Sequence, residues 1–176
     1  MVKLAKFIGY FLFFIIALMY FTPKVSLYYF AETKVEPFGV VVTEESVVDN
    51  GLRLSLKDAV ITFKSIESAE VKNVDIAIFG LYNSIDVSSV TLASTVATFL
   101  PTDIKNINIS YSILDPLNIL ASASGGFGEA NAKVNILDKK LFLKLSPSKL
   151  MSKKYRSTLR NLNKSEDGGY EYAKTF

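Results

Sequence analysis

Residues 119–145 read ILASASGGFGEANAKVNILDKKLFLKL, and this stretch decides the fold class. Apolar residues alternate with Ser, Asn or Lys before the glycine cluster at 125–128, after it, and again after Asp138-Lys139. Alternation with a period of two is typical of strands that bury one face, and glycine and Asp-Lys tracts supply the turns between them. The stretch therefore predicts three consecutive antiparallel strands.

The same alternation continues through residues 38–146. It recurs in LRLSL at 52–56, in VKNVDIAIF at 71–79 and in NINISYSI at 106–113. We expect a mainly β fold, an antiparallel meander sheet with one buried face and one wetted face. Val87–Leu92 is assigned to a strand, whereas residues 93–100 have a spacing that suits a helix and a composition that suits a strand.

An uncharged stretch, FIGYFLFFIIALMYFTP, occupies residues 7–23. As a helix it spans about 25 Å, close to the bilayer core of about 30 Å. We expect a transmembrane helix, with these apolar side chains as the membrane anchor: Phe7, Phe11, Phe14, Ile15, Leu18 and Phe21. A cleaved signal peptide would need small residues where residues 18–21 are large, and a soluble core helix would keep a polar stripe.

Positive charge sets the expected orientation of this anchor. Lys3 and Lys6 lie in the tail at 1–6, so the positive-inside rule predicts a cytoplasmic N-terminus. In a bacterium with two membranes, the anchor would then lie in the inner membrane and the bulk of the chain in the periplasm. For the juxtamembrane segment at 24–37 we favour a short helix over an extended chain.

A second helix is expected over residues 147–164, with Ser146 as its N-cap and Pro147 in its first turn. Apolar residues at helical spacing form one stripe, and the other faces carry six cations and no acid: Lys149, Lys153, Lys154, Arg156, Arg160 and Lys164. Such a helix can pack on the sheet, dock on an acidic partner or lie on anionic lipid. The tail at 165–176 alternates Tyr170, Tyr172 and Lys174, which predicts an edge strand.

Composition excludes much of enzyme chemistry. The 176 residues contain no His, Cys or Trp, which removes Ser-His and Cys-His nucleophiles and Cys/His zinc sites. Ser146 and Lys149 match S-x-x-K, but the companion motifs of that enzyme class are missing, and a strand pattern follows the glycine cluster where a phosphate loop needs a helix. We predict no catalytic residue, no metal and no cofactor, and a net charge of +3 is too small to indicate nucleic acid.

Three stretches carry a family resemblance: the anchor at Phe7–Phe21, LRLSLKDAVITF from Leu52, and ASASGGFGEANAKVNI from Ala121. Asp167-Gly168-Gly169-Tyr170 adds an aspartate-glycine-tyrosine pattern near the end. With these features the chain resembles the type II secretion system protein N family, which is related to the AsmA-like envelope proteins. The resemblance implies a non-catalytic, inner-membrane-anchored part of an envelope machine, and it transfers no binding residues.

Two hypotheses for function follow. The first is a structural or assembly component of a bacterial envelope complex, such as a secretion system, a pilus or a flagellar-motor accessory. Its sheet edges and basic helix would contact other envelope proteins or a second copy of the chain, while the N-terminal helix contacts the bilayer. The alternative is a periplasmic module of the AsmA-like type that binds lipids or other hydrophobic molecules on the apolar face of the sheet.

Overall fold

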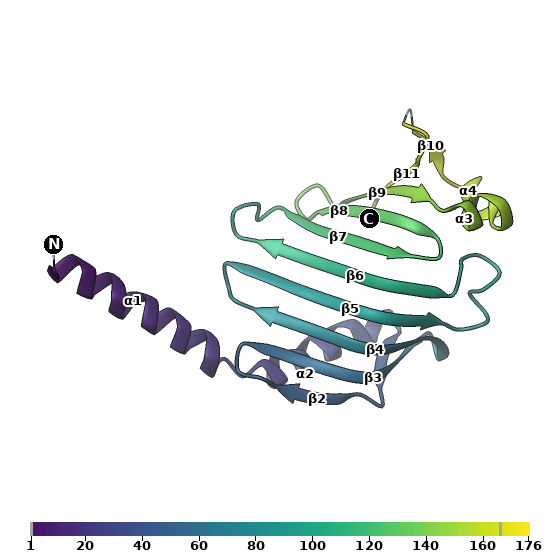
Figure 1. The fold of residues 1–176 in the computed structure, drawn as a ribbon. Coiled ribbons are helices and arrows are strands. Elements are labelled where there is room, and N and C mark those ends of the chain that lie inside the picture. Colours follow the sequence, from purple (N-terminus) through teal and green to yellow (C-terminus); the bar gives the residue numbers. More distant parts are fainter. Residues whose placement is uncertain (1, 166) are drawn as a thin grey trace.

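The computed structural model describes residues 2–165 and 167–176 (Figure 1). Two helices, α1 (Val2–Phe21) and α2 (Lys24–Val35), and a 3-10 helix, η1 (Glu36–Phe38), precede the sheet. The strands and C-terminal helices follow in this order: β1 (Val40–Thr43), β2 (Ser46–Asp49), β3 (Arg53–Phe63), β4 (Ile66–Ile78), β5 (Tyr82–Leu92), β6 (Asp103–Ser112), β7 (Asn118–Gly125), β8 (Gly128–Asn135), β9 (Lys140–Pro147), α3 (Lys149–Lys154), α4 (Arg156–Leu159), β10 (Asn163–Lys164) and β11 (Tyr170–Thr175).

In the described part of the chain, the strands form one eleven-stranded antiparallel sheet. From β3 to β9 each strand pairs with the next, after which β11 pairs with β9, and β10 lies at that edge. At the other edge β1 and β2 pair with successive parts of β3. The predicted mainly β fold with an antiparallel meander is confirmed, and the tail strand expected near Tyr170 belongs to this sheet.

Two rows of residues cross eight strands on one face of the sheet, and every member of both rows is apolar. The first row contains Leu54, Ile76, Ile85, Ile109, Ala121, Ala132, Leu143 and Tyr172. The second row contains Leu56, Val74, Val87, Ile107, Ala123, Ala130, Leu145 and Tyr170. At about 4.8 Å between strands, each row is about 34 Å long. We call these two rows the apolar face.

A line of extra residues crosses β3 to β6 next to the second apolar row. Each strand here has two polar residues between apolar ones, as LKDA at 56–59, VKNV at 71–74, VSSV at 87–90 and IKNI at 104–107. Asp58 and Ser89 adopt the left-handed conformation, with φ of 55° and 58°. The extra residues of neighbouring strands lie opposite one another, so the register is kept across them, but each one changes which side chains of its own strand face inward. Ala59, Val71 and Val90 therefore pack on the same side as Val74 and Val87.

This row of extra residues keeps each strand continuous across a change in its alternation. In the sequence the alternation of LRLSL at 52–56 changes phase before the apolar run at 60–63, a pattern that is also typical of a strand boundary. The structure has one strand, β3, that runs through Asp58. The segment at 93–100, where a strand and a helix were both open, forms turns after β5 ends at Leu92.

The single helix expected over residues 147–164 is not what the structure has. Pro147 ends β9, and Ser148, not Ser146, caps α3 by accepting a hydrogen bond from Met151 N at 3.0 Å. The helix breaks at Tyr155, whose φ of −114° and ψ of 38° separate α3 from α4. The break has a packing reason, because Met151, Tyr155 and Leu159 all turn onto Phe127 and Leu145 of the sheet.

The junction between α1 and α2 is held by polar contacts. Lys24 is fully buried, and its Nζ donates hydrogen bonds to Met19 O at 2.9 Å and Thr22 O at 3.2 Å. A cation at these carbonyls stabilises the C-terminal end of α1. The ring of Tyr20 lies against Gly51 in the β2–β3 turn, where a Cβ would come within 2.3 Å of the ring. Gly51 also has a φ of +78°, a conformation that favours glycine. The absence of a side chain at Gly51 therefore lets the end of α1 pack against this end of the sheet.

Candidate functional site

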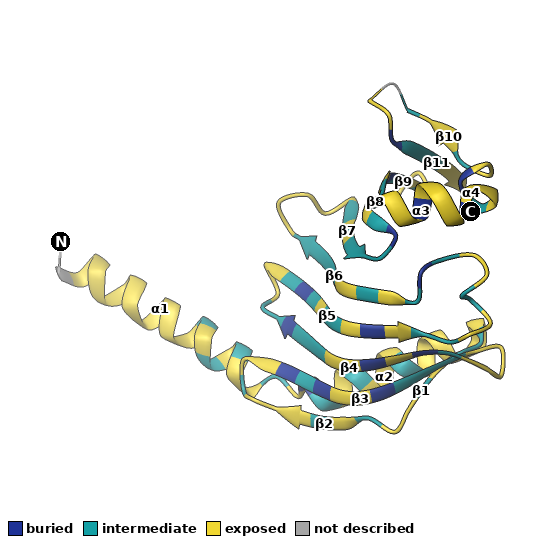
Figure 2. Cartoon of the chain, turned by 45° about the vertical axis from the view of Figure 1, so that its right-hand side comes forward, coloured by how far each residue is buried: buried dark blue, intermediate teal, exposed yellow. Residues whose placement is uncertain are grey.

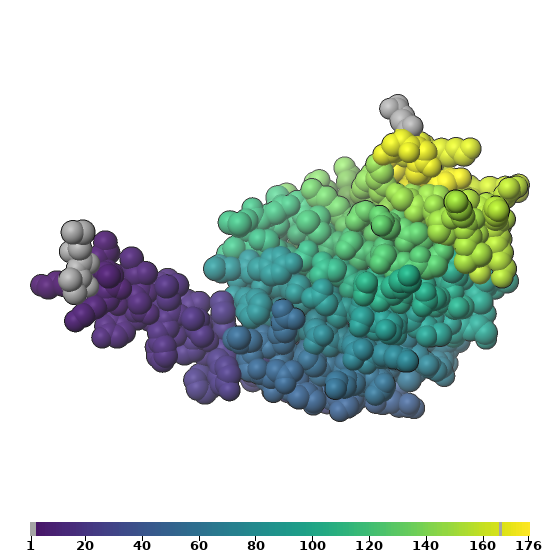
Figure 3. All heavy atoms as spheres, viewed as in Figure 1, coloured from purple at the N-terminus to yellow at the C-terminus, as the bar shows by residue number. Residues whose placement is uncertain are grey.

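The N-terminal helix stands apart from the sheet. In α1, residues 3–21 have a mean hydropathy of 2.1, and none of this window is buried in the protein (Figure 2). The space-filling view shows α1 as an arm that projects from the domain (Figure 3). Twenty helical residues span about 30 Å, the thickness of a bilayer core. The helix is long and apolar enough to cross a membrane.

The predicted anchor residues follow the length of this helix. The large side chains among them are mostly exposed, from 55% at Phe11 to 79% at Phe21, and Ile15 is half-buried. Exposed aromatic rings along a whole helix are unfavourable in water, so α1 requires an apolar environment that the domain does not supply.

In the part of the chain that the structure describes, helices cover the apolar face only at its ends. Leu54 and Leu56, on the strand along which α2 packs, are 0% and 3% exposed. At the other end Leu145 is buried under α3 and α4. Between these covers the members of both rows are half-buried, and no described helix forms a core cluster with Ile85 or Ile109. The middle of the apolar face is therefore an open hydrophobic surface.

Small side chains shape this open surface. On β7 and β8 the two rows are occupied by four alanines, Ala121, Ala123, Ala130 and Ala132. Larger residues flank them, with Ile107 and Ile109 on β6 and Leu143 and Leu145 on β9. Ala123 and Ala130 pack against the cluster under α3 and α4, whereas Ala121 and Ala132 lie in the open part of the face. The small side chains leave space between the larger residues of β6 and β9 that a flexible hydrocarbon chain can fill, and we call this strip the trough.

The opposite face of the sheet has a polar central row, beside which Leu120 and Phe142 are exposed, and we call it the polar face. The row that lies between the two apolar rows contains Ser55, Asp75, Asp86, Asn108, Ser122, Asn131, Lys144 and Glu171. Asn108 Nδ2 donates a hydrogen bond to Asp86 Oδ1 at 2.6 Å, and Ser55 Oγ donates to Asp75 Oδ1 at 2.6 Å. Neighbouring strands therefore satisfy part of the hydrogen-bonding capacity of this face within the sheet.

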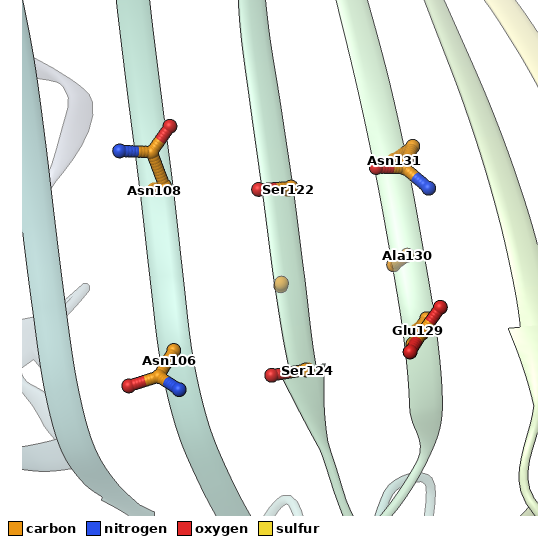
Figure 4. Close-up of a pocket in the computed structure, with 8 residues that line it drawn as sticks. Asn106, Asn108, Ser122, Ser124, Glu129, Ala130 and Asn131 are labelled. Atoms are coloured by element: carbon orange, nitrogen blue, oxygen red, sulfur yellow. The ribbon is translucent and has the colours of Figure 1, made fainter.

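A shallow hollow of about 230 Å³ lies on the polar face, and its short amide and hydroxyl side chains come from β6, β7 and β8 (Figure 4). Of its eight lining residues only Glu129 is ionisable. A single carboxylate with amides and hydroxyls can accept and donate hydrogen bonds, but general acid–base catalysis usually pairs two titrating groups. The sequence carries no local signal for this hollow, because its lining residues come from three separate strands.

The six predicted contact cations lie together at the end of the sheet where β9 finishes. All six side chains are exposed: three on α3, Arg156 on α4, Arg160 in the turn after α4 and Lys164 on β10. We call residues 149–164 the basic segment. Arg156, Arg160 and Lys164 line one hollow of about 360 Å³, together with Leu159 and Tyr170. Three cations around a partly apolar hollow suit an anionic group that carries a hydrophobic part.

Acidic residues lie close together where α2 packs against the edge of the sheet at the β1–β2 turn. Tyr28 OH lies 3.3 Å from Glu45 Oε1 and forms a hydrogen bond with it. Burial, and then the charges of Glu45 and Glu32, raise the pKa of Tyr28 well above its usual range. Burial first, and then the charge of Glu45, raise the pKa of Glu32. Protonation of Glu32 therefore favours the contact between α2 and the sheet edge, and this contribution is lost as the pH rises through the folded pKa.

Comparison of the chain with protein-family models, with curated proteins and with solved structures finds no match. The resemblance to the type II secretion system protein N family stays a prediction, and function rests on the surfaces described above.

Proposed function

We infer that the protein is a non-catalytic membrane-anchored module that holds acyl chains on the apolar face of its sheet. The observation that carries this proposal is the open middle of that face, where two apolar rows cross eight strands and no helix among the described residues lies over them between α2 and α3. An open apolar surface of this kind requires an occupant, because soluble domains rarely expose large contiguous hydrophobic patches.

Acyl chains fit this surface better than a protein partner does. The trough of alanines between isoleucine and leucine walls offers aliphatic contacts, and the two rows themselves present no hydrogen-bonding side chain except the tyrosine hydroxyls at one edge. A protein interface usually includes about one hydrogen bond per 100–200 Å². Anchoring by α1 also keeps the surface beside a supply of lipid.

The test fills the trough. In Ala132→Leu, added methyl groups occupy the space that a chain would take, and the half-buried site accepts them. The matched control is Lys133→Leu, which places the same side chain on the polar face of the same strand. We expect native mass spectrometry of detergent-extracted protein to show bound phospholipid in the control and less in Ala132→Leu. Equal lipid in both variants, or none in the wild type, contradicts the proposal.

For the location of the protein we propose a single-pass arrangement with the N-terminus in the cytoplasm and the sheet outside. Lys3 and Lys6 on the N-terminal side of α1 support this orientation. In a bacterium with two membranes the sheet would be periplasmic. Protease added to intact spheroplasts is then expected to digest the sheet domain and to leave an N-terminal tag intact.

A second candidate function is assembly into an envelope complex, and an open sheet edge favours it. β10 covers β11 only at Tyr170 and Glu171, so in the described part of the chain the outer edge of β11 is free from Tyr172 to Thr175. A free edge can pair with a strand from another chain. The basic residues lie next to this edge and would select an acidic partner.

This second function has its own test. Arg156→Glu, Arg160→Glu and Lys164→Glu together reverse the charge around the basic hollow. Crosslinking in intact cells is expected to capture a partner with the wild type and to lose it with the triple variant. The control Lys64→Glu changes an exposed cation in the β3–β4 turn, outside the basic segment, and should retain the partner. Retention by the triple variant argues against the role of these cations.

A further inference from the structure

One end of the sheet carries exposed apolar residues in every turn that lies there. These turns are β2–β3, β4–β5, β6–β7 and β8–β9, and the C-terminus joins them after β11. The exposed side chains are Leu52 at 44%, Leu81 at 62%, Ile113 at 52%, Leu114 at 92%, Leu117 at 45%, Ile136 at 48%, Leu137 at 72% and Phe176 at 66%. We call these eight residues the apolar rim.

Backbone hydrogen bonds join four of the five rim segments, from the β4–β5 turn to the C-terminus. Ile113 N donates to Leu81 O at 2.9 Å, which joins the β4–β5 turn to the next one. Ile136 N donates to Leu117 O at 2.8 Å, and Phe176 N donates to Lys139 O at 3.0 Å. Turns that satisfy one another's backbone groups can leave bulk water at a lower cost than free loops can.

The rim lies at the end of the sheet where α1 leaves it. Tyr20, one residue before the end of α1, packs on Gly51 next to Leu52 of the rim. Figure 1 shows the rim turns of β2–β3, β4–β5 and β6–β7 on the left of the sheet, the side toward which α1 extends. A bilayer that contains α1 therefore has its surface at the level of these turns.

We propose that the apolar rim inserts shallowly into the same bilayer that α1 crosses, so that the sheet stands on the membrane with its strands pointing away from it. The inference rests on the proposed membrane anchoring, and it names lipid as the partner of a surface that the anchor alone does not explain. Exposed leucine and isoleucine at loop tips beside a membrane gain apolar burial when they enter the interface.

The charged residues of the rim limit its depth. Asp115 accepts a hydrogen bond from Asn118 Nδ2 at 2.6 Å, and Asp138 and Lys139 form the β8–β9 turn. Ionised groups stay at the headgroup level, so only the tips at Leu81, Leu114 and Leu137 reach the acyl chains. The opposite end of the sheet also exposes large apolar residues, namely Phe38, Phe63, Ile66 and Phe99. That end carries the exposed cations of α3 and α4, with Thr158 Oγ1 donating to Phe99 O at 2.7 Å, and α1 packs against the other end, at Gly51.

This orientation has a consequence for both surfaces described above. The trough runs along β7 and β8 toward the rim turns, so an acyl chain could pass from the bilayer to the trough without crossing water. The basic segment lies at the far end of β9, whose eight residues span about 26 Å. The cations then face away from the anchoring membrane, which leaves them for a partner at a distance from it.

The experiment uses the absence of cysteine in the chain, since one substitution supplies a unique labelling site. Full-length Leu114→Cys and Leu137→Cys, labelled with an environment-sensitive fluorophore, are reconstituted into phosphatidylcholine–phosphatidylglycerol vesicles. Ser157→Cys on α4 is the matched exposed control at the far end, and Phe14→Cys reports on α1. Lipids with a nitroxide quencher near the headgroup are then added to the vesicle composition.

We expect a blue shift and strong quenching at positions 114 and 137, and neither at position 157. If position 14 is shielded by lipid but 114 and 137 behave like 157, the rim inference is wrong while the anchor stands. If position 14 is in water as well, the anchoring on which the inference rests has failed. Quenching at the rim with no bound lipid in the trough experiment supports the rim and contradicts the acyl-chain function.

Discussion

The row of extra residues can be tested at Ser89, because deleting this residue should be strongly destabilising whereas substituting it should change stability little. Ser89 is the extra residue of β5, in the left-handed conformation at φ 58°. Without it, the second half of β5 must change phase relative to β4 and β6. Val90, which is 4% exposed, and Leu92 would then turn to the polar face, and Thr91 would turn inward.

The size of the effect follows from these side chains. Burying a Val or Leu side chain contributes about 1.5–3 kcal/mol, so losing both costs about 3–6 kcal/mol. An unpaired Thr hydroxyl at an apolar position adds roughly 1–3 kcal/mol. Domains of this size are typically stable by about 5–15 kcal/mol, so the deletion removes much or all of the stability. Ser89→Gly keeps the residue and suits its φ, so its effect should stay within about 1 kcal/mol.

The assay is thermal unfolding followed by far-ultraviolet circular dichroism, with all variants in the same detergent. Deletion of Ser94, an exposed residue in the loop after β5, serves as the control for shortening the chain. We expect the Ser89 deletion to lower Tm by roughly 10–20 °C or to abolish the transition, at about 2–4 °C per kcal/mol. Equal Tm values for the two deletions would refute the reasoning that the row of extra residues sets which side chains of each strand face inward.

Three further predictions concern the packing around the sheet. Met151→Ala should destabilise the domain by about 2–5 kcal/mol because Met151 is 0% exposed, whereas its neighbour Leu150→Ala, 49% exposed, should change the free energy of unfolding by less than about 0.5 kcal/mol in urea titrations. Lys24→Met removes the ammonium group from the carbonyls at the end of α1 and should speed amide hydrogen exchange at residues 22–27. Lys34→Met, at an exposed site of α2, should leave this exchange unchanged. Equal exchange rates in the two variants would contradict the capping role of Lys24. Because the pKa of Glu32 is raised, its contribution to stability is present below the ordinary value of 4.5 and is lost as the pH rises through the folded value. Glu32→Gln should therefore reduce the fall in the free energy of unfolding between acid and neutral pH, relative to a Glu70→Gln control. A pH profile that is unchanged in Glu32→Gln would contradict this prediction.

Several features could be predicted from the sequence because each depends on neighbours in the chain. The apolar run before Pro23 predicts a helix suited to a membrane, since its length and its lack of a polar stripe are local properties. Alternation around the glycine cluster predicts the hairpin of β7 and β8 for the same reason. The cluster of cations at 149–164 is evident from the sequence alone, and their exposure to solvent is expected because charged side chains are rarely buried.

Other features depend on which strands pair and in what register, and only the tertiary structure decides them. The phase change at Asp58 and Ser89 looks like a strand boundary until the neighbouring strands show the same extra residue. The basic segment had the spacing of one helix, but packing of Met151, Tyr155 and Leu159 on the sheet divides it. The open apolar face and the rim arise when residues from eight strands and five chain segments meet, because a meander brings alternate turns to the same end of the sheet.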